Sequence, residues 1–170
     1  MDMSIRDLSG NLTSLQRTYL FSILIPSVVG GGDSRAISIR TQKAEIPAIE
    51  YGAINVPYKA TPGINFHGKK NIRHEWSLSF IEGEDAAIAT AFTQWGNAVV
   101  DSDSGLSNPD PSLKTDAYVE LTKTDGSVAI RYKIVGIFVK TLTPGRLDQK
   151  SEEGLTYDVV FSCDDVVVAE

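Results

Sequence analysis

The chain has 170 residues and a mass of 18.4 kDa, which suits one domain with a substantial core. Hydrophobic residues make up 42% and charged residues 22%, so a disordered or fibrous chain is excluded. The one cysteine, Cys163, excludes an internal disulfide framework. The longest apolar run, residues 19–25, is much shorter than the about 20 residues of a membrane span. Residues 1–15 lack the apolar core of a signal peptide, so we expect synthesis in the cytoplasm.

The formal net charge of −6 is concentrated in the second half of the chain. Residues 1–83 hold nine Lys/Arg and seven Asp/Glu, whereas residues 84–170 hold seven Lys/Arg and fifteen Asp/Glu. A basic surface for duplex nucleic acid is therefore not expected. The acidic excess serves solubility, or it keeps a surface from retaining a polyanion that slides past it.

Alternation of apolar and polar residues dominates the chain and predicts strands. Asp125-Gly126 between two alternating segments is typical of a hairpin turn. The polar and glycine-rich or proline-rich stretches 26–35 and 101–113 are predicted to be long loops. The expected strands cover residues 17–25, 36–44, 51–58, 74–81, 117–123, 128–141 and 155–163, with a further short strand at 64–67.

One segment changes to a helical period. Ile88, Phe92, Trp95 and Val99 are spaced by four, three and four residues, which predicts a helix over about 84–99. In the preceding strand every second residue is apolar, so both elements should contribute to one core. The predicted core residues are Trp76, Leu78, Phe80, Phe92 and Trp95. The sequence thus predicts a mainly β domain over 1–170, a two-sheet β-sandwich or barrel of about seven or eight strands with one α-helix.

Residues with catalytic potential are few. His67 and His74 have no further His or Cys nearby that would complete a metal site. Cys163 alternates with Phe161 and is expected to be a buried, unreactive thiol. The acidic stretch that begins at Asp101 lacks the later carboxylate of a calcium loop. We therefore expect no catalytic residue, metal or cofactor, and no enzyme activity.

Several segments, taken in order, resemble the tail tube proteins of contractile-tailed bacteriophages. No single segment is diagnostic, and their order and spacing carry the resemblance. The segments are RTYLFSI at 17–23, KAEIP at 43–47, INVPYK at 54–59, HEWSLSFI at 74–81 and AFTQWGNA at 91–98.

The resemblance implies a structural subunit that forms hexameric rings, which stack into a hollow tube. Each subunit would lend strands to a continuous inner β-barrel, and DNA and the tape measure protein would pass through the lumen without specific binding. The implied partners are other copies of the chain and the tail sheath, baseplate and tail terminator proteins, and the implied location is the virion tail. Pairing of strand edges around a ring also removes edges that could aggregate.

Two sets of residues follow from combining this resemblance with the strand pattern. Small or polar residues opposite the apolar strand faces are the candidates to line the lumen: Ser38, Arg40, Gln42, Ala53, Asn55, Glu75, Ser77 and Ser79. The long loops and an N-terminal arm over 1–16 are expected to bridge subunits, with candidate contacts at Gly30, Gly31, Gly32, Asp103, Ser104, Leu106 and Pro109.

Two alternatives remain. The related tube proteins of type VI secretion and of extracellular contractile injection systems would carry effectors through the same fold. A small-ligand-binding β-barrel, in contrast, would be a stable monomer with an enclosed apolar pocket.

Overall fold

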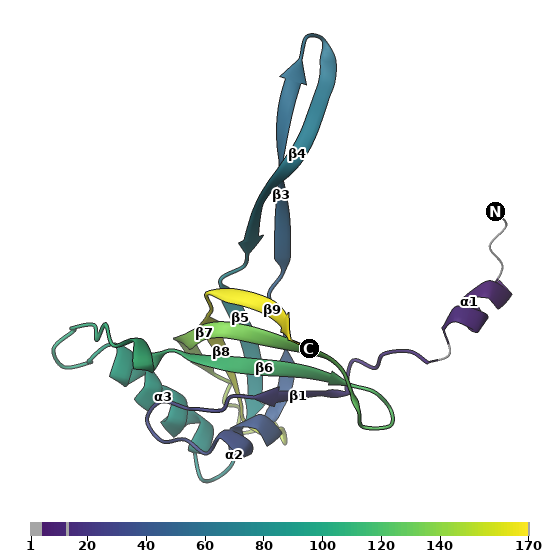
Figure 1. Ribbon diagram of the computed structural model, residues 1–170. Coiled ribbons are helices and arrows are strands. Elements are labelled where there is room, and N and C mark those ends of the chain that lie inside the picture. Colours follow the sequence, from purple (N-terminus) through teal and green to yellow (C-terminus); the bar gives the residue numbers. More distant parts are fainter. Residues whose placement is uncertain (1–4, 13, 170) are drawn as a thin grey trace.

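The computed structural model describes residues 5–12 and 14–169 (Figure 1). Strands account for 47% of the chain and helical residues for 17%, which confirms the mainly β class. Within the described residues the elements are α1 (Ile5–Asn11), β1 (Phe21–Leu24), α2 (Ser34–Ile39), β2 (Thr41–Ala44), β3 (Ile49–Tyr58), β4 (Thr61–Ile72), β5 (Glu75–Ile81), α3 (Ala87–Val99), the 3₁₀-helix η1 (Pro111–Leu113), β6 (Thr115–Thr122), β7 (Val128–Pro144), β8 (Thr156–Ser162) and β9 (Asp165–Ala169).

One antiparallel sheet of seven strands forms the body, in the order β1-β6-β7-β8-β5-β2, with β9 also paired to β7. The 17-residue strand β7 serves both halves of this sheet: its first half pairs with β6 and β9, and its second half pairs with β8. Gly136 lies at the change of partners with a φ of +66°, a backbone conformation that favours glycine. Its N–H donates to Asp116 Oδ1 at 3.0 Å. The sheet bends there but its described strands do not close into a barrel.

The core lies between the two halves of the bent sheet and helices α2 and α3. Five aromatic side chains meet in its centre, with Phe161 contacting Trp76, Phe92 and Trp95, and Phe80 contacting Phe92. All of these side chains are fully buried. The structure therefore places Trp76, Leu78, Phe80, Phe92 and Trp95 together in the core.

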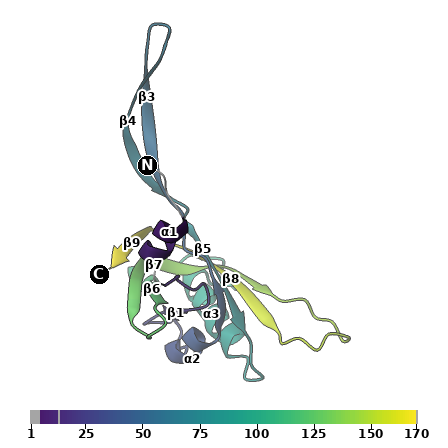
Figure 2. The same cartoon turned by 90° about the vertical axis from the view of Figure 1, so that its right-hand side faces the viewer.

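Strands β3 and β4 form a separate two-stranded hairpin that stands clear of the body (Figures 1 and 2). On another side of the body, α1 also stands apart, joined through an extended segment (Figure 1). The β7–β8 connection projects in a third direction (Figure 2). The expected N-terminal arm 1–16 thus contains a helix, while residues 1–4 and 13 of that arm lie outside the described residues.

Several predicted elements were wrong in type or extent. Residues 36–44 are not one strand, because α2 occupies Ser34–Ile39 and β2 begins at Thr41. The Asp33 carboxylate accepts hydrogen bonds from the N–H groups of Arg35 and Ala36 and so begins this helix. The short strand predicted at 64–67 is part of the 12-residue β4. The second described sheet is the hairpin, and β9 adds a ninth strand.

Candidate subunit interface

The hairpin of β3 and β4 carries an apolar face that no part of the described chain covers. Cross-strand register pairs Ile54 with Phe66 and Val56 with Ile64. Opposite residues share a face of a β-ribbon, and residues two apart along a strand return to that face. Tyr58 therefore extends the same row. These five side chains remain 48–63% exposed.

The base of the hairpin is fixed to the body. Ile49 and Ile72 pack against the core where the two strands leave it. Lys70 Nζ contacts Asp165 Oδ1 at 2.7 Å and donates to the Val166 carbonyl oxygen at 3.1 Å, which ties β4 to β9. This contact lowers the pKa of Asp165 through the hydrogen bond from Lys70. The apolar face is therefore held out in a defined direction.

The two strands approach each other closely near this base. A Cβ added at Gly68 would lie 2.6 Å from the Gly52 carbonyl carbon, so residue 68 must be glycine for the strands to keep this separation. The register shifts between Tyr51 and Ala53 at the same level. The ribbon can twist strongly there because no side chain separates its backbones.

The hairpin is also basic although the whole chain is acidic. Residues 49–73 contain four Lys/Arg and one carboxylate, Glu50. Of the basic residues, Lys70 and Arg73 pair with Asp165 and Glu75 of the body. The hairpin is thus a basic, apolar ribbon on a protein of net charge −6.

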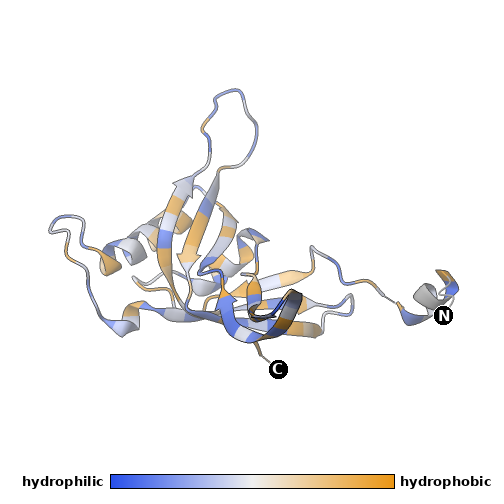
Figure 3. Ribbon diagram, turned by 90° about the horizontal axis from the view of Figure 1, so that it is seen from above, coloured by the Kyte–Doolittle hydropathy of each residue, from blue (hydrophilic) through white to orange (hydrophobic). Residues whose placement is uncertain are grey.

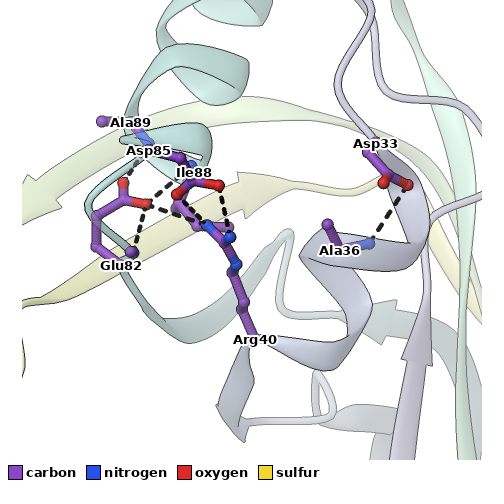
Figure 4. Close-up of polar contacts among 8 residues, drawn as sticks. Asp33, Ala36, Arg40, Glu82, Asp85, Ile88 and Ala89 are labelled. Atoms are coloured by element: carbon purple, nitrogen blue, oxygen red, sulfur yellow. Dashed lines mark hydrogen bonds and ion pairs between the residues drawn. The ribbon is translucent and has the colours of Figure 1, made fainter.

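A polar network fixes the opposite end of the body (Figure 4). The guanidinium of Arg40 contacts both carboxylate oxygens of Asp85 at 2.7–2.8 Å and Glu82 at 3.5 Å. The nearly buried Glu82 carboxylate accepts hydrogen bonds from the N–H groups of Gly83, Ile88 and Ala89. Arg40 lowers the pKa of Asp85 through its hydrogen bond. Arg40 thus joins the end of α2 to the start of α3.

The eight residues predicted to line a lumen lie in three different places. Ser38 and Arg40 belong to α2 and its end, so the alternation argument was wrong for them, and Gln42 lies on β2. Ala53 and Asn55 are on the hairpin, where Asn55 Nδ2 donates to Asn65 Oδ1 at 2.8 Å.

The other three lumen candidates share one face of the body sheet. Glu75, Ser77 and Ser79 alternate along β5 with the buried core residues and point away from the core. Glu75 pairs with Lys140 and Arg73, and Ser79 Oγ donates to Asp158 on β8. This polar face crosses β5, β8 and β7, and its exposure to a lumen stays a prediction.

The loop that contains Gly30, Gly31 and Gly32 lies against the body. A Cβ at Gly32 would approach the Ala91 Cβ to 2.9 Å, and one at Gly30 would approach the Gln94 Cβ to 3.0 Å, so this loop packs on α3. Val28 is buried as well. Residue Gly31 has a φ of +92° and its N–H donates to the Val28 carbonyl. This loop therefore packs within its own subunit, and its contact with other subunits stays a prediction.

The loop after α3 is long and exposed, as predicted from its polar sequence. Asp103, Ser104, Leu106 and Pro109 are all exposed, and the Leu106 side chain is 71% exposed. Backbone hydrogen bonds from Asp101 N to Leu106 O and from Asn108 N to Val99 O give this loop a fixed shape. Bridging of subunits by these residues stays a prediction.

Two histidines and one cysteine were considered for chemistry. His67 lies on the hairpin, and His74 Nδ1 is 2.9 Å from the carbonyl oxygen of Cys163. Burial raises the pKa of the Cys163 thiol. Across the described ranges, no group of three or more His, Cys, Asp or Glu residues is placed to hold a metal ion. The helices described are all too short or too polar to cross a bilayer.

Comparison with solved structures gives matches over nearly the whole chain. One match is a chain of the PVC sheath/tube terminator in the extended state, with 16% identity, coverage of 94% of this chain and 99% of that chain, and a TM-score of 0.70. Another is a chain of the PVC sheath-tube complex in the extended state, with 15% identity, coverage of 99% of both chains and a TM-score of 0.68. A chain of the cap that terminates the tube of the anti-feeding prophage also matches, with 18% identity, coverage of 92% of this chain and 91% of that chain, and a TM-score of 0.68. This chain has the fold of contractile injection tube proteins. No protein-family profile matches the sequence, and no curated relative matches it either.

The tube-protein fold confirms the family resemblance at the level of fold. Sequence reasoning missed the exposed apolar face of the hairpin, although a signal was present. Ile54, Val56 and Tyr58 before the turn and Ile64 and Phe66 after it are spaced by two on both sides of Pro62-Gly63. That spacing places all five on one face of a hairpin. Its length and lack of cover could not be read from the pattern.

Proposed function

We propose that this chain is a structural subunit of the inner tube of a contractile tail, and that its copies form rings that stack into a hollow tube. The observation that carries the proposal is the hairpin: a ribbon that stands clear of the body with a row of 48–63% exposed apolar side chains. An isolated two-stranded hairpin is marginal in water, so this ribbon needs contacts from another molecule. The tube-protein fold supports a second copy as that molecule.

The finer proposal is the tube of a bacteriophage tail. In it, hexameric rings conduct the genome, while sheath, baseplate and terminator proteins bind the tube and the tape measure protein passes through it. The chain would be made in the host cytoplasm and function in the virion without enzymatic activity. The acidic charge of the chain supports weak retention of DNA in such a channel.

A second candidate is the tube of an extracellular contractile injection system. The matches to PVC and anti-feeding prophage chains, which cover 92–99% of this chain, favour it. Electron microscopy of particles labelled with an antibody to this chain distinguishes the two. Labelled tails attached to DNA-filled heads support the phage tube, whereas labelled particles without heads support the injection system.

Assembly of the purified protein tests the shared part of the proposal. We expect rings or tubes in negative-stain micrographs and a ring-sized species in light scattering. The double variant Ile54→Asn/Phe66→Asn should remain folded by circular dichroism but lose assembly. The matched control Ala53→Ser/His67→Gln changes the opposite face of the same ribbon and should assemble. A wild-type protein that stays monomeric at every concentration contradicts the proposal.

A further inference from the structure

The N-terminal arm presents apolar side chains without cover. Ile5 is 83% exposed, Leu12 49% and Leu15 60%. In the sequence, apolar residues at 5, 8, 12 and 15 follow a helical spacing of three, four and three. A helix as short as the seven-residue α1 is not stable alone in water. Packing of this apolar row against another surface would stabilise the helix and remove the exposed area from water.

The body carries an apolar groove of matching character. Two adjoining hollows share Val99 and Phe138. One of about 530 Å³ lies between the C-terminal half of α3 and the second half of β7, and one of about 350 Å³ lies between these two residues and the segment 108–114. Leu142 extends the first hollow along β7. Gly96 leaves the helix side open, because a Cβ added there would meet nothing within 4 Å. Residues 138–144 of β7 pair with β8 along one edge, and no described strand pairs with their other edge.

The arm and the groove of one chain lie on opposite sides of the body. Figure 1 shows α1 to the right of the sheet and the end of α3 to the left, and the view from above in Figure 3 keeps the arm and the loop after α3 at opposite ends. Gln16 Nε2 donates to the Thr122 carbonyl oxygen at 2.9 Å, which fixes the root of the arm at the far end of β6. The arm therefore points away from the groove of its own chain.

We propose that residues 5–12 of the N-terminal arm pack their apolar side chains into the α3–β7 groove of a second copy. This inference rests on the proposed function and names a contact that joins its subunits. Because arm and groove are different surfaces, the contact runs head to tail, and such contacts close into a ring or continue as a filament.

Charge supports a second copy as the occupant. The loop that borders the groove carries Asp101, Asp103 and Asp110 and has no Lys or Arg between residues 100 and 113. Lys114 and Lys140 also line the hollows, but each is already paired with a carboxylate of its own chain, Asp164 and Glu75. Residues 5–17 carry Arg6 and Arg17 against one carboxylate, Asp7, so the arm and its root together have a net charge of +1. The basic residues of the arm of one copy would thus face the acidic loop of the next.

A disulfide-trapping experiment tests the contact directly. Cys163 is buried, so the wild-type chain supplies no accessible thiol among its described residues. The pair Leu12→Cys/Thr93→Cys places one thiol on the arm and one in the groove. We expect a ladder of cross-linked chains on non-reducing gels, and none for the control pair Leu12→Cys/Lys43→Cys. Equal cross-linking of both pairs, or cross-linking only within one chain, overturns the inference.

Two substitutions at Gly96 provide a second, independent test. Gly96→Trp fills the groove from a position with open space, whereas Gly96→Ala keeps the groove free and should not lower the melting temperature. We expect Gly96→Trp to abolish the disulfide ladder of the trapping pair and reduce ring formation at least tenfold, with Gly96→Ala unchanged. If Gly96→Trp assembles like wild type, the inference fails while the proposed function stands. If wild type forms no rings at all, the proposed function fails.

Discussion

At the scale of single residues, Glu82 replaces the missing cap of α3. Ala86 precedes the helix in a left-handed conformation and offers no side-chain acceptor. The Glu82 carboxylate, which precedes the helix, accepts hydrogen bonds from the N–H groups of Ile88 and Ala89 in the first turn and from that of Gly83. Free N–H groups at a helix start are costly when they are buried. The position of α3 over the core therefore depends on a residue outside the helix.

Glu82→Ala should destabilise the subunit by roughly 1–3 kcal/mol, because it removes the acceptor of these N–H groups and one partner of Arg40. Urea unfolding followed by circular dichroism measures this loss. The control Glu84→Ala changes an exposed carboxylate in the same loop and should stay within about 0.5 kcal/mol of wild type. Equal stability of both variants would contradict the capping role.

Acid should weaken the fold because the pKa values of several aspartates lie below their ordinary value of 3.8. The Gly136 N–H and Lys133 lower the pKa of Asp116, Arg40 lowers that of Asp85, and Lys70 lowers that of Asp165. A carboxyl group with a lowered pKa in the folded state stabilises the fold above its unfolded pKa and loses that effect as pH falls.

We therefore expect melting temperatures to fall as the pH decreases below about 4. Thermal unfolding of dissociated subunits at a series of pH values measures this. Asp116→Asn should lower stability at neutral pH and show a smaller decrease in acid than wild type. An unchanged pH profile in that variant would remove Asp116 from the explanation.

At the scale of elements, the hairpin separates folding from assembly. Its strands touch the core only at Ile49 and Ile72, and apart from the half-buried Gly52, Gly63 and Gly68 the other residues are exposed. Changes in the ribbon should therefore affect contacts between copies much more than the stability of the body. The close approach at Gly68 offers a precise place to test this.

Gly68→Ala should distort the hairpin, because the added Cβ would lie 2.6 Å from the backbone of Gly52. We expect the melting temperature of the body to change little and the yield of tubes to fall severalfold, measured by sedimentation and micrographs. Gly154→Ala is a suitable control, since a Cβ at Gly154 makes only ordinary contacts with the Ile81 side chain, at 3.4 Å or more. Normal tube yield from Gly68→Ala would show that the assembly tolerates a distorted hairpin.

The sequence predicted an element well where its apolar residues repeat with a single period and all of them are buried in the core. Trp76, Leu78 and Phe80 alternate and are all buried, and Ile88, Phe92 and Trp95 follow a helical period and are all buried. For residues 36–44, alternation was misleading. Ile37 is buried but Ile39 is 74% exposed, because Asp33 begins a short helix that the two-residue spacing could not reveal.

The remaining errors have a similar physical origin. Glu84 and Asp85 were expected in the first turn of the helix, yet α3 begins at Ala87 and Asp85 pairs with Arg40 from α2. That contact joins residues 45 positions apart, and local patterns cannot reveal it. The hairpin strands were predicted in type, but whether their apolar face is covered depends on the arrangement of all other elements.

At the scale of the whole molecule, the projecting parts leave the body in different directions. The hairpin, the N-terminal arm, the loop after α3 and the β7–β8 connection each extend from a different side (Figures 1 and 2). Strands of ten and twelve residues span roughly 35–40 Å at about 3.4 Å per residue. Such reach allows one subunit to touch several neighbours within a ring and between rings.

Deleting residues 102–108 should therefore impair stacking of rings more than it impairs folding of the subunit. These residues are exposed, and the core does not include them. The melting temperature of dissociated subunits and the tube length in micrographs measure the two effects. A control that replaces the same residues by glycine and serine keeps the loop length and separates the role of the side chains from that of the backbone. Tubes of normal length from the deletion would show that this loop is only a connection.

The uncovered hairpin has a kinetic consequence. The first two copies to meet must order their ribbons and arms while burying only part of the apolar face, so early contacts are weak. A copy that joins a complete ring buries more surface for the same loss of freedom. Growth from an existing end should therefore be much faster than spontaneous nucleation, and a concentrated pool of free subunits can persist until a template starts the tube.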